Sequence, residues 1–241
     1  MPRGIFVTGT DTNVGKTVVS AALMVRYRAE APLKYWKPVQ TGIRDSGFGI
    51  RHPDMGAAGD DDSAEVARLS CAREGEIVNR GIRLPDPVSP HLAAQRAGTR
   101  IAVRAIVEIL KEIESRIPNP ESRWIVEGAG GVLVPINEHE TMADLMRALD
   151  LPVLIAARST LGTINHTLMT IEALRRRMLR VAGVVMVGEP NEENRMAIEK
   201  YGAAEVIAEM PRFDPLTPDA LEGWARTSFD PNGVLFVGCL R

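Results

Sequence analysis

The chain has 241 residues, and its 29 Lys and Arg nearly balance its 31 Asp and Glu, giving a formal net charge of −2 at pH 7. This balance gives no electrostatic reason to expect nucleic acid or an acidic membrane surface as a partner. The length is typical of one domain, so we expect a single domain over residues 1–241.

Seven short apolar runs predict strands, at Ile5–Thr8, Tyr35–Val39, Trp124–Val126, Val153–Ala157, Val181–Val187, Glu205–Ile207 and Val234–Val237. Helical patterns alternate with them, at Val18–Arg28, Ser63–Leu69, Ile101–Ile113, Met142–Leu149, Thr163–Arg177, Glu192–Tyr201 and Pro218–Ala225. This alternation predicts an α/β fold with one doubly wound, mainly parallel sheet and helices on both faces. Ligands of such a sheet bind at the carboxyl ends of the strands.

Several other features bear on class and location. The stretches Ile43–Gly59 and Arg80–Pro90, rich in Gly or Pro, predict long loops. The two cysteines, Cys71 and Cys239, have neither metal-ligand nor disulfide spacing. The N-terminus lacks a basic region followed by a long apolar segment, and no run approaches about 18 apolar residues, so we expect no secretory signal and no membrane span. We therefore expect a cytoplasmic protein.

The most informative segment is Gly9–Thr17, which follows the first predicted strand and opens the first predicted helix. Strand, glycine-bearing turn, lysine, hydroxyl and helix form the layout of a phosphate-binding loop (P-loop). Amides at the helix start and the Lys16 ammonium suit phosphate, and the Thr17 hydroxyl suits Mg²⁺. Gly9 and Gly15 are separated by five residues instead of the usual four, so the alternative is a chance Gly-Lys-Thr at a helix start. The flanking strand and helix argue against it, and the segment predicts a nucleoside triphosphate site.

Two acidic positions are candidate Mg²⁺ ligands, because this ion prefers carboxylate and phosphate oxygens. Glu127 ends the apolar run Trp124–Val126 and precedes Gly128–Gly131, which would let a ligand approach the backbone. The alternative is a solvated acid at a strand end. Asp62 ends an Asp-Asp-Asp run, and it is equally well explained as the N-cap of the following helix, with Glu65 completing a capping pair.

Two further segments are candidates for anion contacts. Lys37 lies at the end of the second predicted strand, where it would stabilise charge on a transferred phosphoryl group, and its alternative is a surface lysine. Leu161–His166 follows the strand Val153–Ala157 and begins a helix, so its amides form a possible second anion site. Taken in isolation, this second segment is better explained by ordinary helix capping.

Five motifs occur here in order: GTDTNVGKT at Gly9–Thr17, KPVQTG at Lys37–Gly42, SPH at Ser89–His91, VEGAGG at Val126–Gly131 and LGTINH at Leu161–His166. Together they resemble the dethiobiotin synthetase family, in which the five-residue spacing of the loop is normal. The resemblance implies a P-loop NTPase fold and an ATP- and Mg²⁺-dependent enzyme of biotin biosynthesis. It implies that 7,8-diaminopelargonate and CO₂ form a carbamate, that ATP phosphorylates it, and that ring closure gives dethiobiotin, ADP and phosphate.

The resemblance also implies site residues, position by position. Lys37 and Lys16 would be catalytic, and Thr17, Asp62 and Glu127 would bind Mg²⁺. Nucleotide contacts would come from Asn13, Val14, Gly15, Lys16, Thr17, Val18, Asp62, Glu127, Gly128, Ala129, Gly130, Gly188, Glu189, Pro211, Arg212 and Phe213. Diamine contacts would come from Thr12, Lys37, Thr41, Gly162, Thr163, Ile164 and Asn165, the last four from a neighbouring subunit, so a homodimer is implied.

The chain departs from the family at Asn13, where an acid is often found, and at Gly188-Glu189, where family members carry the Asn that reads the purine edge. Preference for adenine is therefore left open. Two other classes of protein fit the sequence less well. A partitioning-type nucleotide switch would carry a lysine five positions before Lys16, where this chain has Asp11. An amide-forming ligase of the cobalamin pathway would need an added glutaminase domain, for which we expect no room.

Overall fold

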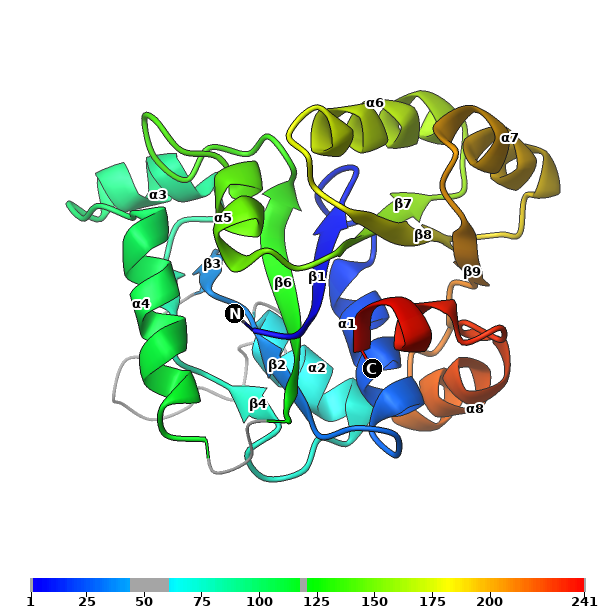
Figure 1. Cartoon of the computed structure of the whole chain (residues 1–241), viewed down its shortest axis with the longest axis horizontal. Coiled ribbons are helices and arrows are strands. Elements are labelled where there is room, and N and C mark those ends of the chain that lie inside the picture. Colours follow the sequence, from blue (N-terminus) through cyan, green and yellow to red (C-terminus); the bar gives the residue numbers. More distant parts are fainter. Residues whose placement is uncertain (1, 44–60, 118–120, 241) are drawn as a thin grey trace.

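The structure is a computed structural model and describes residues 2–43, 61–117 and 121–240. Its centre is a seven-stranded sheet in the order β4-β2-β6-β1-β7-β8-β9, in which every neighbouring pair is parallel (Figure 1). The strands are β1 (Gly4–Gly9), β2 (Leu33–Trp36), β4 (Ile77–Val78), β6 (Arg123–Gly131), β7 (Val153–Arg158), β8 (Val181–Val187) and β9 (Val206–Met210). The expected doubly wound parallel sheet is confirmed.

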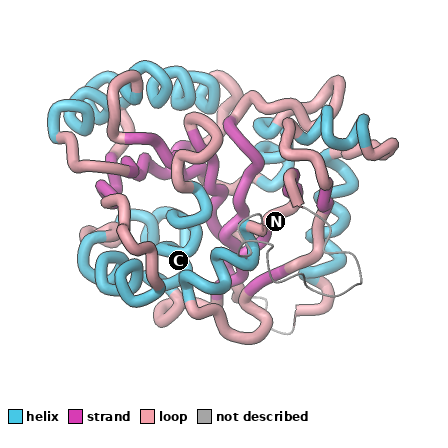
Figure 2. Tube along the Cα trace, turned by 180° about the vertical axis from the view of Figure 1, so that it is seen from behind, coloured by secondary structure: helices cyan, strands magenta, loops and turns pink. Residues whose placement is uncertain are grey.

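Helices cover both faces of this sheet, as the views from opposite sides show (Figures 1 and 2). One apolar cluster joins one face to α1 (Lys16–Tyr27), α2 (Asp62–Ser70), α8 (Pro218–Ser228) and the C-terminal η1 (Phe236–Leu240). A second cluster joins the other face to α3 (Pro90–Arg96), α4 (Val103–Glu114), α5 (Met142–Leu149), α6 (Thr163–Arg175) and α7 (Glu192–Gly202). In β7, Val153 to Ala157 are all buried and Arg158 is exposed, which explains the uninterrupted apolar run.

The predicted strand Tyr35–Val39 is in fact broken at Lys37-Pro38. β2 ends at Trp36, and β3 (Val39–Thr41) belongs to a separate two-stranded sheet with β5 (Ile82–Leu84). Proline has no amide hydrogen to continue the ladder of the main sheet. The Pro38 carbonyl instead accepts a hydrogen bond from the Ile82 amide at 2.8 Å. The break releases Lys37 from the sheet at the edge where ligands are expected.

Two other predictions need correction, and one lies outside the described residues. Val234–Val237 is not a strand: the backbone is helical from Val234 through Leu240, and the Asp230 carboxylate accepts the amides of Val234 and Leu235 at 2.8 Å each. The predicted loop Arg80–Pro90 contains β5. The predicted loop Ile43–Gly59 lies, apart from Ile43, outside the described residues. Within the described part of the chain, no helix is both long enough and apolar enough to span a membrane.

Candidate functional site

The loop after β1 presents backbone amides at the start of α1. Asn13 and Gly15 adopt left-handed backbone angles, with φ of 56° and 94°, and α1 begins at Lys16 without a side-chain cap. A Cβ on Gly9 would lie 2.6 Å from Val14 and 2.8 Å from the Asp11 carbonyl, so only glycine fits beneath this loop. The first amides of a helix have no acceptor within it. The loop therefore offers amides to an anion, beside the Lys16 ammonium, which itself donates to the Asp11 carbonyl at 3.1 Å.

Strand alternation turns Glu127 toward α1. In β6, Ile125 packs in the apolar cluster on the α1 side of the sheet, and Glu127 points the same way because side chains two residues apart share a face. Glu127 pairs in register with Val7 of β1 and is 0% exposed. A fully buried carboxylate needs partners to offset its lost hydration. Four hydrogen-bond donors lie within 3.1 Å of its two carboxylate oxygens.

Lys37 is the charged partner of two carboxylates. Its ammonium contacts Glu127 Oε1 at 2.8 Å and also Asp62 Oδ2. Burial alone would lower the pKa of Lys37, but the negative charges of Glu127 and Asp62 outweigh burial and raise it. Lys37 is therefore a fixed cation, 4% exposed, at the carboxyl edge of the sheet. It is not the surface lysine that was the alternative explanation.

The Thr17 hydroxyl lies 3.1 Å from Asp62 Oδ1 and 3.1 Å from Glu127 Oε1. One hydroxyl and two carboxylates thus meet from α1, α2 and β6. Mg²⁺ prefers such hard oxygens, usually one or two carboxylates with phosphate oxygens and water completing the shell. The two carboxylates already hold one cation, the Lys37 ammonium. The donor set therefore fits a magnesium ion carried by a nucleotide.

The role of helix cap falls on Asp61, not on Asp62. Asp61 Oδ1 accepts from the amides of Ser63 at 2.9 Å and Ala64 at 3.4 Å. Glu65, expected to complete a capping pair, instead binds Arg68 with both oxygens, at 2.8 and 2.7 Å. Because the neighbouring residue caps the helix, the Asp62 carboxylate remains directed at Thr17 and Lys37.

Two further residues hold Glu127, and the sequence analysis missed them. Ser20 Oγ donates to Glu127 Oε2 at 3.0 Å, and Tyr35 OH donates to the same oxygen at 2.9 Å. Burial, and then the charge of Glu127, raise the pKa of Tyr35 well above its usual value, so the phenol stays a proton donor. The signal that could have found them is spacing: Ser20 follows Thr17 by three helical positions, and Tyr35 lies two residues before Lys37, within the strand that leads to it.

These groups open into a cavity of about 930 Å³. Of the predicted site residues, it is lined by Thr12, Asn13, Gly15, Lys16, Thr17, Val18, Lys37, Thr41, Asp62, Glu127, Ala129 and Gly130. Residues that were not predicted complete the lining: Gln40, Gly42, Pro85, Pro87, Val88, Ser89, Pro90 and Val134. Burial lowers the pKa of Lys16 here, against an opposing effect of Glu127. The cavity combines two ammonium groups, two carboxylates and a run of amides.

Some predicted residues do not line this cavity. Val14 is buried in the core, and Gly128 packs against the Phe6 ring. The predicted base-side residues Gly188, Glu189, Pro211, Arg212 and Phe213 follow β8 and β9 at the same edge of the sheet. Gly162–Asn165 also lie elsewhere, at the exposed start of α6, where Gly162 is the N-cap and no side chain caps the helix. A Cβ on Gly162 would meet no atom within 4 Å, so this helix start opens outward.

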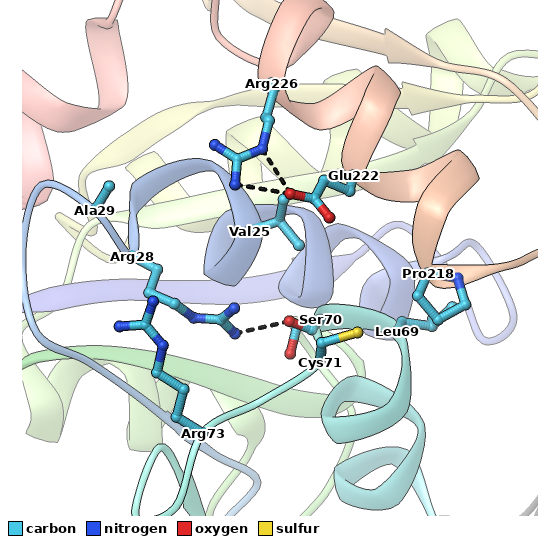
Figure 3. A pocket seen from close by; sticks show the side chains of 10 residues that line it. All are labelled: Val25, Arg28, Ala29, Leu69, Ser70, Cys71, Arg73, Pro218, Glu222 and Arg226. Carbon is cyan, nitrogen blue, oxygen red and sulfur yellow. Dashed lines mark hydrogen bonds and ion pairs between the residues drawn. The ribbon is translucent and has the colours of Figure 1, made fainter.

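A smaller cavity of about 100 Å³ lies between the far ends of α1 and α2 and the side of α8 (Figure 3). It contains none of the predicted site residues. Its charges are largely satisfied by protein groups, since Arg226 pairs with Glu222 at 2.7 Å and Arg28 donates to the Ser70 carbonyl at 2.8 Å. The ionisable side chains and loop amides predicted for the site therefore line the larger cavity and not this one.

Comparison with known proteins places these features in a family context. Residues 3–220 match a family model described as an AAA domain. The "ATP-dependent dethiobiotin synthetase BioD" of Paramagnetospirillum magneticum is 44% identical over 227 residues, which cover 94% of this chain and 97% of that protein. The protein of the same name from Rhodopseudomonas palustris is 39% identical over 230 residues, covering 95% and 96%.

Two solved structures share the fold. A ParA family ATPase from Chlorobium tepidum superposes with a TM-score of 0.53 at 11% identity, covering 98% of this chain and 92% of that one. The MinC:MinD cell division complex of Aquifex aeolicus gives a TM-score of 0.55 at 16% identity, covering 98% and 96%. At these identities the likeness concerns the fold alone, which is that of P-loop NTPases.

Proposed function

Because the chain belongs to the dethiobiotin synthetase family, it is an ATP-dependent ligase that forms C–N bonds in biotin biosynthesis, and we propose that its reaction takes place in the 930 Å³ cavity. The observation that carries this proposal is the joint placement of Lys16, Lys37 and Glu127 beside the amides of the loop after β1. Positioning and neutralisation of phosphate charge are what phosphoryl transfer requires of a protein.

The first step needs little from the protein beyond position. One amine of 7,8-diaminopelargonate adds to the carbon of CO₂ and loses a proton, which gives a carbamate. We place this carbamate beside Lys37, with the Thr12 and Thr41 side chains at the diamine end of the cavity. The raised pKa of Lys37 keeps its ammonium protonated, so it acts as a fixed positive charge and not as a base.

The second step transfers a phosphoryl group. A carbamate oxygen attacks the γ-phosphorus of ATP, and the bond to the β-phosphate oxygen breaks to release ADP. The Lys16 ammonium and the amides of residues 13–18 hold the phosphates, and Lys37 neutralises charge on the transferred group. The second amine then attacks the carbonyl carbon, expels phosphate and loses a proton to it, which closes the cyclic urea. Every bond formed is matched by one broken, and no redox partner is needed.

Thr17, Asp62 and Glu127 would hold the magnesium ion of MgATP, for which their oxygens fit. When bound, the ion supplies positive charge at the phosphate oxygens. The contribution of the chain is to keep the three oxygens converging on one point. β6, whose Glu127 is fully buried, and the capped start of α2 fix two of them.

We also propose a homodimer in which the start of α6 reaches the partner's cavity. Leu161, directly before the helix, is 103% exposed, and Met169 on α6 is 51% exposed. The start of α6 at Gly162–Asn165, which has no side-chain cap although the Thr163 amide donates to the Thr160 carbonyl at 3.1 Å, would bind the carboxylate tail of the diamine, as a helix start favours an anion. Gly188, Glu189 and Pro211–Phe213 are proposed to lie on the base side of ATP, and we further propose a cytoplasmic location.

The test is an incubation of the protein with 7,8-diaminopelargonate, ¹³C-bicarbonate, Mg²⁺ and ATP, followed by mass spectrometry. We expect a cyclic urea carrying one ¹³C, together with stoichiometric ADP and phosphate. ATP hydrolysis that does not depend on the diamine, with no labelled product, would refute the proposal.

A further inference from the structure

The geometry around Glu127 divides its carboxylate into two differently used oxygens. Oε1 faces the cavity, where it meets Thr17 at 3.1 Å and Lys37 at 2.8 Å. Oε2 faces the core, where it meets Ser20 at 3.0 Å and Tyr35 at 2.9 Å. The two oxygens therefore have different neighbours, although a free carboxylate can exchange them by rotation.

We propose that Ser20 and Tyr35 are positioning residues, which hold Oε2 of Glu127 so that Oε1 alone is presented to the cation site. This inference deepens the proposed function and rests on its assignment of Glu127 as a magnesium ligand. It adds two residues that do not line the cavity.

Burial explains why two donors are used. Glu127, Ser20 and Tyr35 are each 0% exposed, so no water replaces a lost hydrogen bond at Oε2. Rotation of the carboxylate would break two hydrogen bonds to a charged group, each worth about 1.5–3 kcal/mol. Partners of this kind orient metal ligands, and their loss typically weakens metal affinity about 10–100-fold.

The two donors also come from separate elements that pack on Glu127. Ser20 lies one turn beyond Thr17 on α1, so one helix contributes a hydroxyl to each oxygen of the carboxylate. Tyr35 lies in β2, which pairs directly with β6. If the two hydrogen bonds only satisfied a buried acid, their loss would lower the stability of the fold and leave magnesium binding unchanged. Positioning predicts in addition a change in magnesium dependence.

The experiment compares Tyr35→Phe and Ser20→Ala with matched controls. Tyr27→Phe removes another fully buried tyrosine hydroxyl that donates to a carboxylate, that of Asp230, away from the cavity. Ser70→Ala removes a buried serine hydroxyl that donates to the Val66 carbonyl. Binding of a non-hydrolysable ATP analogue is measured by calorimetry across a Mg²⁺ series and in EDTA, so the readout does not depend on turnover.

We expect Tyr35→Phe and Ser20→Ala each to raise the Mg²⁺ concentration for half-maximal binding about 10-fold, the lower end of that range because one donor to Oε2 remains, with affinity in EDTA within about twofold of wild type. Tyr27→Phe and Ser70→Ala should leave the magnesium midpoint unchanged. Steady-state kinetics of both test variants should show a lower kcat with a nearly constant KM for the diamine. If Tyr35→Phe does not fold, Ser20→Ala provides the same test.

Glu127→Gln separates the two ways of failing. If Glu127→Gln raises the magnesium midpoint while Tyr35→Phe and Ser20→Ala behave like their controls, positioning is refuted and the assignment of Glu127 stands. If Glu127→Gln leaves the midpoint unchanged, the assignment of Glu127 in the proposed function is itself wrong, and the positioning role fails with it.

Discussion

At the scale of single residues, the site depends on a few ionisable side chains placed within an apolar interior. Lys37 and Glu127 are both nearly inaccessible to water, and removing one partner of such a pair leaves an uncompensated charge at a cost of about 3–5 kcal/mol. Asp62 gives the cluster a second carboxylate, so Lys37 alone does not balance the negative charge. Lys16 supplies the second ammonium group of the cavity, so its two carboxylates and two ammonium groups balance in charge.

A second buried group lies at the other end of α1 and makes the stability depend on pH. Tyr27 donates to Asp230, which is 1% exposed and also caps the C-terminal helical segment. Burial, and then the hydrogen bond and charge of Asp230, raise the pKa of Tyr27 above its ordinary value of about 10. Because the folded-state pKa is the higher one, this stabilisation is complete below about pH 10 and is lost as the pH rises further.

We therefore expect the free energy of unfolding to fall between pH 10 and 11 by up to about 1.4 kcal/mol for each such tyrosine. Tyr35 contributes in the same range, since its pKa is also raised. Tyr27→Phe should be less stable than wild type at pH 8 and should show a shallower decline above pH 10. Guanidinium unfolding at several pH values measures both. Parallel pH profiles for the two proteins would contradict this explanation.

At the scale of elements, two helices begin at the site, and their first turns carry side chains that line the cavity. α1 begins at Lys16 and Thr17, and α2 begins at Asp62. The Asp61 cap fixes the first turn of α2, while Thr217 caps α8 away from the cavity by accepting from the Ala220 amide at 3.2 Å. The two N-caps are chemically similar, but only the Asp61 cap is next to a residue of the site, Asp62.

We expect Asp61→Ala and Thr217→Ala each to lower the free energy of unfolding by about 1 kcal/mol, the usual cost of a lost N-cap. Only Asp61→Ala should also weaken magnesium-dependent nucleotide binding, because it loosens the turn that orients Asp62. Chemical denaturation and calorimetry separate the two effects. Equal nucleotide affinity in both variants would show that the cap does not orient Asp62.

The position of a residue within its element decides whether the sequence could predict its role. Residues that follow an apolar run or open a helix, such as Glu127 and Lys16, were predictable from the sequence, although β6 continues past Glu127 to Gly131. Ser20 and Tyr35 were missed because a hydroxyl on a core-facing surface looks like ordinary packing. The short strands β3, β4 and β5, of two or three residues each, have no period to detect. Val234–Val237 was misassigned because its local apolar pattern carries no trace of the distant contact between Asp230 and Tyr27.

At the scale of the whole molecule, one part of the proposed substrate site does not face the cavity. The start of α6 is exposed beside Leu161, and the adjoining helix carries the half-exposed Met169. An exposed leucine next to uncapped amides is expected to be covered in the active assembly, and a second copy of the chain would cover it while placing those amides at the neighbouring cavity.

Leu161→Asp is predicted to shift the molecule toward the monomer and to lower kcat/KM for the diamine at least tenfold, as loss of a central interface residue does. Met178→Asp is the matched control, since Met178 is 91% exposed beyond the end of α6. Light scattering after size exclusion gives the mass, and steady-state kinetics give the activity. A monomeric Leu161→Asp protein with full activity would show that the site is complete within one subunit.

The most direct test of the account is the effect of Lys37→Ala on product formation and on nucleotide binding, measured on the same preparation. Lys34→Ala is the control, because Lys34 lies in β2, just before Lys37, and donates to the Gly75 carbonyl at 2.6 Å away from the cavity. We expect Lys37→Ala to slow dethiobiotin formation about 100–1,000-fold, the usual cost of losing a group that stabilises transition-state charge, while MgATP affinity changes less than about threefold. Turnover of Lys37→Ala close to that of Lys34→Ala would contradict the account.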